Sequence, residues 1–230
     1  MPSATRHSPL ATVYVVDDDA SFLSAVTRLL RAGGYQVALF TSAAAFLQSP
    51  PAADWPGCLI VDLQMPGLSG LELQEALAKR NNPLPLVFLT GHGDIPSSVR
   101  AMRRGAEDFL TKPVRKRALF DAVERALARD ATGRAQRTRQ RELQARFEGL
   151  TPREREVLAH VLSGQLNKQV ASDLGTSERT IKAHRANIMA KLEVQSVAEL
   201  ARLAQEAGFS VVSNQWPVAS GKWVATSSGQ

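Results

Sequence analysis

The chain has 230 residues, of which 44% are hydrophobic and 22% charged, and a formal net charge of +6 at neutral pH. This length suits two domains better than one, and the composition excludes wholesale disorder, collagen and fibrous proteins. Without an apolar run long enough to span a bilayer or an apolar signal-peptide segment in residues 1–10, we expect a cytoplasmic protein with no membrane partner. The single cysteine, Cys58, excludes an intrachain disulfide and a cysteine zinc site.

The positive charge is concentrated in the second part of the chain. Residues 1–128 contain 13 Lys or Arg and 12 Asp or Glu, whereas residues 129–230 contain 15 and 10. This asymmetry indicates a polyanionic partner for the second part, with nucleic acid as the first candidate and a solvated basic surface as the alternative.

The first part of the chain alternates short apolar runs with segments of helical periodicity. Each crossover between parallel strands needs a connection about the size of a helix. The alternation therefore predicts an α/β doubly wound fold, with a five-stranded parallel sheet covered on both faces. The expected strands are 12–16, 36–40, 58–61, 86–90 and 108–111, and the expected helices are 21–31, 43–48, 70–80, 97–105 and 117–128.

Residues 129–149 break this alternation. Asp130, Thr132 and Gly133 interrupt the helical pattern, and arginines dominate the stretch that follows. We interpret this segment as a linker, either flexible or helical, and its Arg, Gln, Glu and Ala content favours partial helix. The predicted division is 10–128 for the first domain, 129–149 for the linker and 150–210 for the second domain.

The second domain is predicted to be small and all-α. Thr151 is a helix N-cap, followed by Pro152 and by Glu154, which completes a capping box. Gly164 ends this helix, and further helices are expected at 168–174, from 177 to 192 and at 197–207. Residues 211–230 are polar, and we expect a loosely ordered tail.

Acidic side chains follow two of the predicted strands. Asp17 and Asp18 come after the first strand and Asp62 after the third, while Asp19 is interpreted as the N-cap of the first helix. In an open parallel sheet, ligands bind outside the carboxyl ends of the strands, so these carboxylates are expected to converge. Because converging carboxylates repel one another unless a hard cation neutralises them, the pattern predicts a Mg²⁺-dependent phosphoryl site.

Two more strand ends complete the predicted site. Thr90 ends the fourth strand and offers a hydroxyl group. Lys112 follows the fifth strand and offers an ammonium group to a transferred phosphoryl group.

Four segments, in this order, resemble the receiver domain of two-component response regulators: VVDD (15–18), VDLQMPG (61–67), LTGHGD (89–94) and FLTKP (109–113). The resemblance implies that Asp62 accepts a phosphoryl group from a sensor histidine kinase. It also implies that Mg²⁺ is held by Asp17, Asp18, Asp62 and the backbone carbonyl of Gln64, with Asp17 acting largely through water.

The same resemblance assigns a switch. Thr90 and Lys112 would hold the phosphoryl oxygens, and Phe109 would turn inward when Thr90 moves; a static core aromatic is the alternative for Phe109. The face around the fourth helix and the fifth strand would then be remodelled, and the phosphorylated chain would form a homodimer.

The second domain contains the plan of a helix-turn-helix between Asn167 and Ala186. A short helix, a turn at Gly175 and a second helix with basic residues place the second helix in the major groove of double-stranded DNA. Residues 150–207 resemble the LuxR-type helix-turn-helix, and the whole chain resembles the NarL/FixJ class of transcriptional regulators, closest to the FixJ branch. RNA polymerase is a further expected partner.

By this resemblance, six positions are the expected DNA contacts: Arg179, Thr180, Lys182, Ala183, Arg185 and Lys191. Position 186 is Ala, where related regulators are often basic, so an operator sequence cannot be borrowed from them. The last helix would form a dimer surface with Val194 and with Leu200 or Leu203, unless these side chains pack in the core.

Two other functions are compatible with parts of this pattern. An aspartyl phosphatase or phosphotransferase also uses an aspartate at a strand end with Mg²⁺, but such enzymes commonly carry a second aspartate where this chain has Gln64. We therefore expect no enzyme beyond slow autodephosphorylation. The other alternative, a phosphorylation-independent regulator, is disfavoured by the complete set of Asp17, Asp18, Asp62, Thr90 and Lys112.

Overall fold

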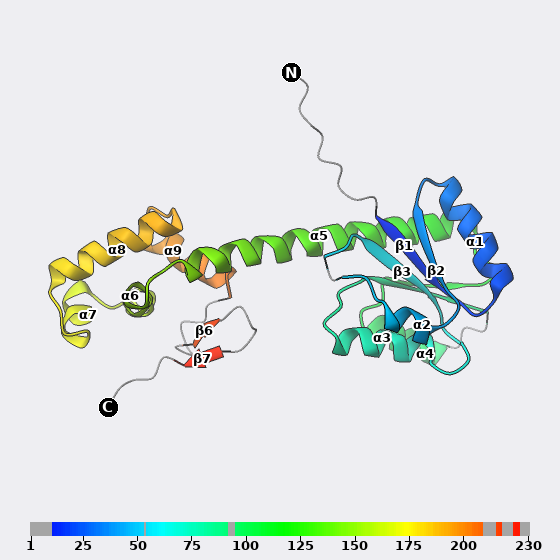
Figure 1. Cartoon of the computed structure of the whole chain (residues 1–230), viewed down its shortest axis with the longest axis horizontal. Helices are drawn as coiled ribbons and strands as arrows, with labels where there is room; N and C mark the ends of the chain where they lie inside the picture. The colour runs from blue at the N-terminus through cyan, green and yellow to red at the C-terminus, as the bar shows by residue number, and fades with distance from the viewer. Residues whose placement is uncertain (1–10, 53, 92–94, 209–214, 218–222, 226–230) are drawn as a thin grey trace, which may run out of the picture. The chain divides into compact units, whose positions relative to one another are not determined.

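The computed structural model describes residues 11–52, 54–91, 95–208, 215–217 and 223–225. It divides into two compact units between Ala135 and Gln136 (Figure 1).

The first unit is built on a parallel five-stranded sheet with the strand order β2-β1-β3-β4-β5. The predicted doubly wound α/β fold is therefore confirmed. The strands are β1 (Thr12–Val16), β2 (Gln36–Phe40), β3 (Gly57–Asp62), β4 (Leu86–Thr90) and β5 (Asp108–Thr111), and the helices are α1 (Ala20–Ala32), α2 (Ala43–Gln48), α3 (Gly70–Lys79), α4 (Ile95–Arg103) and α5 (Lys116–Glu148).

Helices cover both faces of this sheet, because alternate strand residues point to opposite sides. Val13 and Val15 of β1 belong to a buried cluster that includes α1 and α5 side chains such as Leu30 and Leu119. Val16 faces the other way, in a cluster formed largely with α2, α3 and α4. Both faces of the sheet are therefore packed, as the continuous apolar strands predict.

Helix α5 extends through the predicted linker. It continues without a break through residues 129–148, so Asp130, Thr132 and Gly133 do not interrupt the helix and the helical alternative for this segment holds. The Asp130 carboxylate is buried and accepts hydrogen bonds from the Gly57 N–H (3.0 Å) and from Arg134 Nε (2.8 Å). These long-range and local bonds offset the cost of about 1 kcal/mol that a glycine adds to a helix interior.

The second unit is all-α, as expected. It contains α6 (Pro152–Leu162), α7 (Asn167–Asp173), α8 (Glu178–Leu192) and α9 (Val197–Glu206). Thr151 caps α6 and forms the predicted capping box with Glu154. The core also takes in Leu143 and Phe147 from the end of α5.

The side chains expected at a dimer surface lie in this core instead. Val194 and Leu200 are buried, and Leu203 is partly buried against the same cluster. For Val194 and Leu200 the alternative of core packing therefore holds. On α9 the exposed large apolar side chain is Val197.

The tail departs from the expected loose order at two points. Strands β6 (Gln215–Pro217) and β7 (Trp223–Ala225) pair in an antiparallel ladder. The remainder of the predicted tail lies outside the described residues.

Candidate functional site

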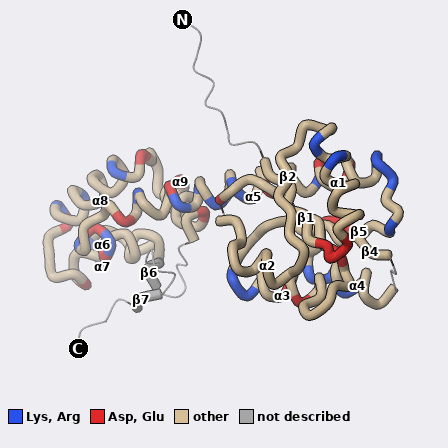
Figure 2. The backbone as a smooth tube through the Cα atoms, turned by 45° about the vertical axis from the view of Figure 1, so that its right-hand side comes forward, with Lys and Arg blue, Asp and Glu red and all other residues tan. Residues whose placement is uncertain are grey.

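The predicted phosphoryl site lies at the carboxyl ends of the parallel strands. Asp17 follows β1, Asp62 ends β3, Thr90 ends β4 and Lys112 follows β5. Figure 2 shows acidic residues gathered beside β1, β4 and β5 in this unit. The topology therefore brings together side chains that are far apart in the sequence.

Lys112 joins the two buried carboxylates. Its ammonium Nζ lies 2.5 Å from Asp17 Oδ2 and 2.9 Å from Asp62 Oδ1. Each carboxylate uses its other oxygen to accept a backbone N–H: Asp17 Oδ1 that of Asp19 at 3.0 Å, and Asp62 Oδ2 that of Gln64 at 2.8 Å. Asp62 is thus held at both oxygens, which fixes the orientation of its carboxylate.

Burial and the contacts with Lys112 determine the pKa shifts of the ionisable side chains at this site. Asp17 is 1% exposed, and burial raises the pKa of its carboxyl even though Lys112 and the Asp19 N–H favour the charged form. Burial alone would lower the pKa of Lys112, but hydrogen bonds to Asp17 and Asp62 outweigh it and raise that pKa. Lys112 is therefore a permanent cation at neutral pH.

An aromatic ring that sequence reasoning missed completes the surroundings of Lys112. The ring centroid of Phe22 lies 4.1 Å from Lys112 Nζ, within the range of a cation–π contact. The signal was available, because the first turn of a helix that follows β1 must lie near the carboxyl end of that strand.

The other predicted residues differ in their placement. Thr90 is buried, and its carbonyl accepts the Lys112 N–H at 2.7 Å, whereas Asp18 is exposed. Phe109 is half-buried, with its ring centroid 6.2 Å from that of Phe88. Phe109 is therefore packed against the core without being sealed in it.

The carboxylates suit a hard divalent cation. Asp17 and Asp62 already direct oxygens at one cation, the Lys112 ammonium, and hard oxygen donors are what Mg²⁺ prefers. Within the described ranges, no three His, Cys, Asp or Glu side chains are grouped so as to hold a metal ion. The Lys112 ammonium lies between the Asp17 and Asp62 carboxylates, whereas Asp18 is exposed.

The helix-turn-helix lies where the sequence predicted it. Helices α7 and α8 are joined through Gly175, whose φ of +62° is in the left-handed region that glycine adopts readily. Val170, Ala171 and Ile181 are buried between the helices. These buried side chains form the core of the motif.

The predicted DNA contacts fall into two groups. Arg179, Lys182 and Ala183 are exposed on α8. Arg185 is half-buried and donates a hydrogen bond from Nη1 to Asn167 Oδ1 at 2.8 Å. Thr180 is half-buried near the start of the helix, where its N–H is capped by the Ser177 hydroxyl.

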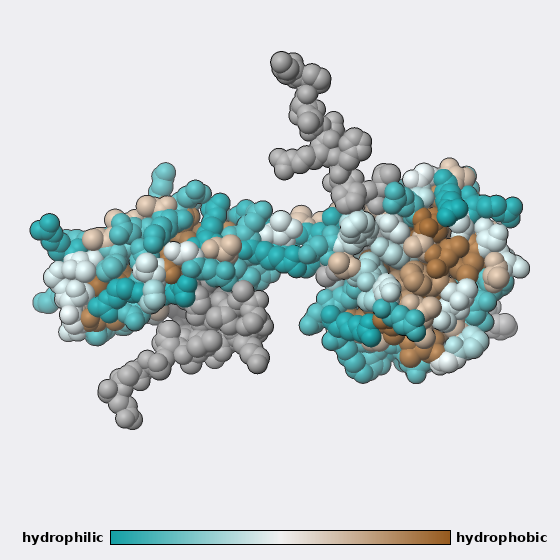
Figure 3. Space-filling model, in the orientation of Figure 1, coloured by the Kyte–Doolittle hydropathy of each residue, from teal (hydrophilic) through white to brown (hydrophobic). Residues whose placement is uncertain are grey.

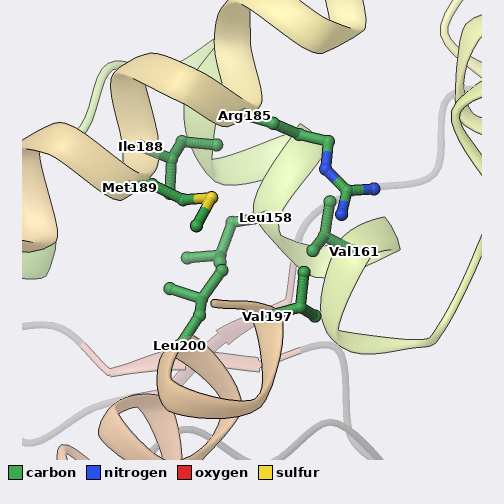
Figure 4. A pocket seen from close by; sticks show the side chains of 7 residues that line it. All are labelled: Leu158, Val161, Arg185, Ile188, Met189, Val197 and Leu200. Carbon is green, nitrogen blue, oxygen red and sulfur yellow. The ribbon is translucent and has the colours of Figure 1, made fainter. Parts of the chain in front are cut away.

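Arg185 also borders a small apolar pocket between α6, α8 and α9. Figure 4 shows its side chain extending beside Val161, with Val197 and Leu200 of α9 across the pocket. Part of the Arg185 side chain therefore packs within the unit, which ties its position to the fold.

Lys191 is engaged inside the unit. Its Nζ lies 2.7 Å from Glu154 Oε2, and the Glu154 side chain is only 5% exposed. The same carboxylate accepts the Thr151 N–H in the capping box. Sequence reasoning therefore assigned Glu154 only in part. It predicted that Glu154 caps α6, but it did not predict the ion pair with Lys191 of α8.

None of the helices in the described part of the chain is both long and apolar enough to cross a membrane.

Comparisons with known proteins match both units. The family described as response regulator receiver domain matches residues 13–124, and bacterial regulatory proteins of the luxR family match residues 148–204. Nodulation protein W of Bradyrhizobium diazoefficiens is 45% identical over 206 residues, covering 90% of each chain. Transcriptional regulatory protein FixJ of Azorhizobium caulinodans is 42% identical over 205 residues, covering 89% of this chain and 97% of that protein.

A solved structure agrees with these sequence matches. The response regulator StyR aligns with a TM-score of 0.74 at 46% identity, covering 86% of this chain and 99% of that chain. The resemblances to receiver domains, to LuxR-type domains and to FixJ are confirmed. The chain belongs to the response regulators that join a receiver domain to a DNA-binding domain of the LuxR family.

Proposed function

We propose that Asp62 accepts a phosphoryl group from a sensor histidine kinase and that phosphorylation controls dimerisation and DNA binding, and thereby transcription. The observation that carries this proposal is the placement of Asp62 at the end of β3. Its carboxylate is oriented by the Gln64 N–H at 2.8 Å and by the Lys112 ammonium at 2.9 Å.

In the proposed reaction, a carboxylate oxygen of Asp62 attacks the phosphorus of a phosphohistidine. The P–O bond to Asp62 forms as the P–N bond breaks, and the electron pair of that bond returns to the imidazole nitrogen of the kinase. Lys112 already contacts Asp62 and is placed to bind a phosphoryl oxygen, which stabilises the negative charge that Asp62 acquires.

A magnesium ion would be held by Asp17, Asp18, Asp62 and the Gln64 carbonyl, and when bound it supplies positive charge that offsets the charge of the phosphoryl group. The Thr90 hydroxyl completes the proposed set by donating a hydrogen bond to a phosphoryl oxygen. Its position at the end of β4, beside Lys112, supports this role.

The proposed switch ends on helix α4. Phe109 is half-buried at the adjacent strand β5, where an inward turn would open space on the α4 side of the sheet. Helix α4 exposes Ile95 (79%), Val99 (42%) and Met102 (45%), which are spaced to share one helix face. Figure 3 shows that apolar patches do reach the surface of this unit. We propose that a second copy of the chain covers this face after phosphorylation.

In the second unit, the exposed face of α8 is the proposed reader of double-stranded DNA. Lys182 and Ala183 are placed for base edges, and Arg179 is placed for phosphate or base contacts. Thr180 and Arg185 stay proposed contacts, with Arg185 oriented by Asn167. Binding of RNA polymerase and action in the cytoplasm complete the proposal.

We propose no enzyme activity beyond slow autodephosphorylation. Position 64 is Gln where aspartyl phosphatases commonly carry a second aspartate, and Gln64 contributes its backbone N–H to Asp62. A strong hydrolytic base is therefore missing from the position that such enzymes use.

The phosphorylation step is tested with acetyl phosphate and Mg²⁺ on wild type and Asp62→Asn. Intact mass should show one added phosphoryl group on wild type and none on the variant, and light scattering should show a dimer only for phosphorylated wild type. If wild type is phosphorylated and stays monomeric with unchanged DNA binding, the switch is wrong and a phosphorylation-independent regulator takes its place.

The DNA step is tested on duplexes selected from a random pool by the phosphorylated protein. Lys182→Ala should bind the selected duplex more weakly and discriminate less well against scrambled duplex. Lys79→Ala, which removes one exposed positive charge from the receiver unit, is the matched control. Full sequence discrimination by Lys182→Ala would remove Lys182 from base readout.

A further inference from the structure

Three of the described residues contact the Lys112 ammonium, and one of them is aromatic. Asp17 and Asp62 bind it at 2.5 and 2.9 Å, and the ring centroid of Phe22 lies 4.1 Å away. Lysine has a flexible four-carbon stem, so the position of its ammonium depends on such contacts. The aromatic face therefore restricts where Lys112 places its charge.

Phe22 is itself held firmly. It lies in the first turn of α1, where the Asp19 carboxylate accepts its N–H at 3.2 Å. Its side chain is half-buried and packs against the core face that α1 and α5 share. The Phe22 ring is therefore packed in a defined position beside the Lys112 ammonium.

A divalent cation and the Lys112 ammonium are attracted to the same two carboxylates. Asp17 Oδ2 and Asp62 Oδ1 are both taken by Lys112, and their remaining oxygens accept backbone N–H groups. A metal ion that binds at these carboxylates therefore lies close to the Lys112 ammonium, and repulsion between the two cations favours withdrawal of Lys112. Any contact that stabilises Lys112 in this position makes this withdrawal harder.

We propose that Phe22 is a positioning residue that holds Lys112 on the Asp17–Asp62 pair and thereby lowers the affinity of the site for Mg²⁺. This inference rests on the proposed function, because it concerns the metal that the proposed phosphorylation requires. The position of Lys112 in the unphosphorylated receiver then depends on an aromatic side chain that itself binds neither metal nor phosphoryl oxygens.

The first experiment measures Lys112 alone, without metal. Trace labelling of lysines with acetic anhydride, followed by peptide mass spectrometry, should modify Lys112 faster in Phe22→Leu than in wild type. Phe22→Tyr keeps the aromatic face and should label at the wild-type rate. Phe120→Leu removes the ring 5.6 Å from Lys116 and is the control for loss of a ring elsewhere in the unit.

The second experiment titrates Mg²⁺ into the same four proteins by calorimetry. Loss of a partly desolvated cation–π contact should tighten Mg²⁺ binding by about two- to tenfold in Phe22→Leu. Phe22→Tyr and Phe120→Leu should bind within about twofold of wild type. Thermal unfolding of each variant shows that the receiver unit is still folded.

The outcomes test separately whether Phe22 positions Lys112 and whether this position lowers the affinity for Mg²⁺. Equal Lys112 labelling in Phe22→Leu and Phe22→Tyr overturns the positioning role, and equal Mg²⁺ affinity in all four proteins overturns its effect on the metal. If Lys112 labelling changes as expected while wild type binds no Mg²⁺, the positioning role stands and the metal dependence of the proposed function fails.

Discussion

Replacement of Lys191 by Met tests whether this lysine stabilises the fold of the second unit or contacts DNA. The substitution removes the ion pair with Glu154, whose two charged atoms lie 2.7 Å apart. It leaves a carboxylate that is 5% exposed with the Thr151 N–H as its remaining partner among the contacts described above. Met keeps most of the apolar stem, so packing is largely preserved.

The expected loss of folding free energy follows from the exposure of the Lys191 and Glu154 side chains. A hydrogen bond to a charged group contributes about 1.5 to 3 kcal/mol, and the 42% exposure of the Lys191 side chain reduces this to about 1 to 2 kcal/mol. For a unit of this size, the melting temperature should fall by about 5 to 10 °C. Calorimetry of the full chain measures the shift, and Lys182→Met, on an exposed lysine of the same helix, is the control.

The stability difference between wild type and Lys191→Met should depend on pH with a definite sign. Burial raises the pKa of Glu154, but hydrogen bonds from Lys191 and Thr151 outweigh burial and hold that pKa below its ordinary value. The carboxylate therefore stabilises the fold above the unfolded pKa of about 4.3, and the stabilisation is lost as the pH falls through the folded pKa. The gap between wild type and Lys191→Met should close in acid. Equal melting of Lys191→Met and Lys182→Met, with a salt slope of DNA binding reduced by about 1 for Lys191→Met, would refute the structural role.

Three further predictions concern the receiver unit. Asp130→Asn should lower the free energy of unfolding in urea by about 1 to 2 kcal/mol, because it weakens the buried bond to the Gly57 N–H; an unchanged midpoint contradicts this. Gly70→Ala should melt earlier and phosphorylate more slowly, since its Cβ would lie 2.4 Å from the Asp62 carbonyl oxygen; wild-type behaviour contradicts the close packing. Burial raises the pKa of Cys58 to about 12, so iodoacetamide should modify it at pH 8 only after unfolding.

Strand ends were the most predictable part of the site. Apolar runs place Asp62 and Thr90 at the ends of neighbouring parallel strands, and the topology rule then puts them at one edge of the sheet. The rule gives no distances, so it did not show that Lys112 bridges Asp17 and Asp62. That arrangement depends on rotamers that only the packed structure determines.

Helix α5 shows why local sequence left residues 129–149 open between a flexible linker and a helix. Asp130 reads as a helix breaker within its own window, but its carboxylate is buried against Gly57, 73 residues away in sequence. Tertiary contacts override such local preferences, and the periodicity of residues 129–149 could not reveal them. The ion pair of Lys191 could not be foreseen for the same reason, since its partner Glu154 lies on another helix.

The ion pairs of the second unit also reduce the number of its basic side chains that are available to DNA phosphates. Arg139 binds Glu206, Arg146 binds Glu193 and Lys191 binds Glu154, so these cations are partly neutralised within the unit. Each such pair must loosen before its cation neutralises a phosphate and releases a counterion. The number of phosphate contacts should therefore be smaller than the basic residue count implies. We therefore expect attraction to DNA to depend chiefly on side chains that the fold leaves exposed on α8, which include Arg179 and Lys182.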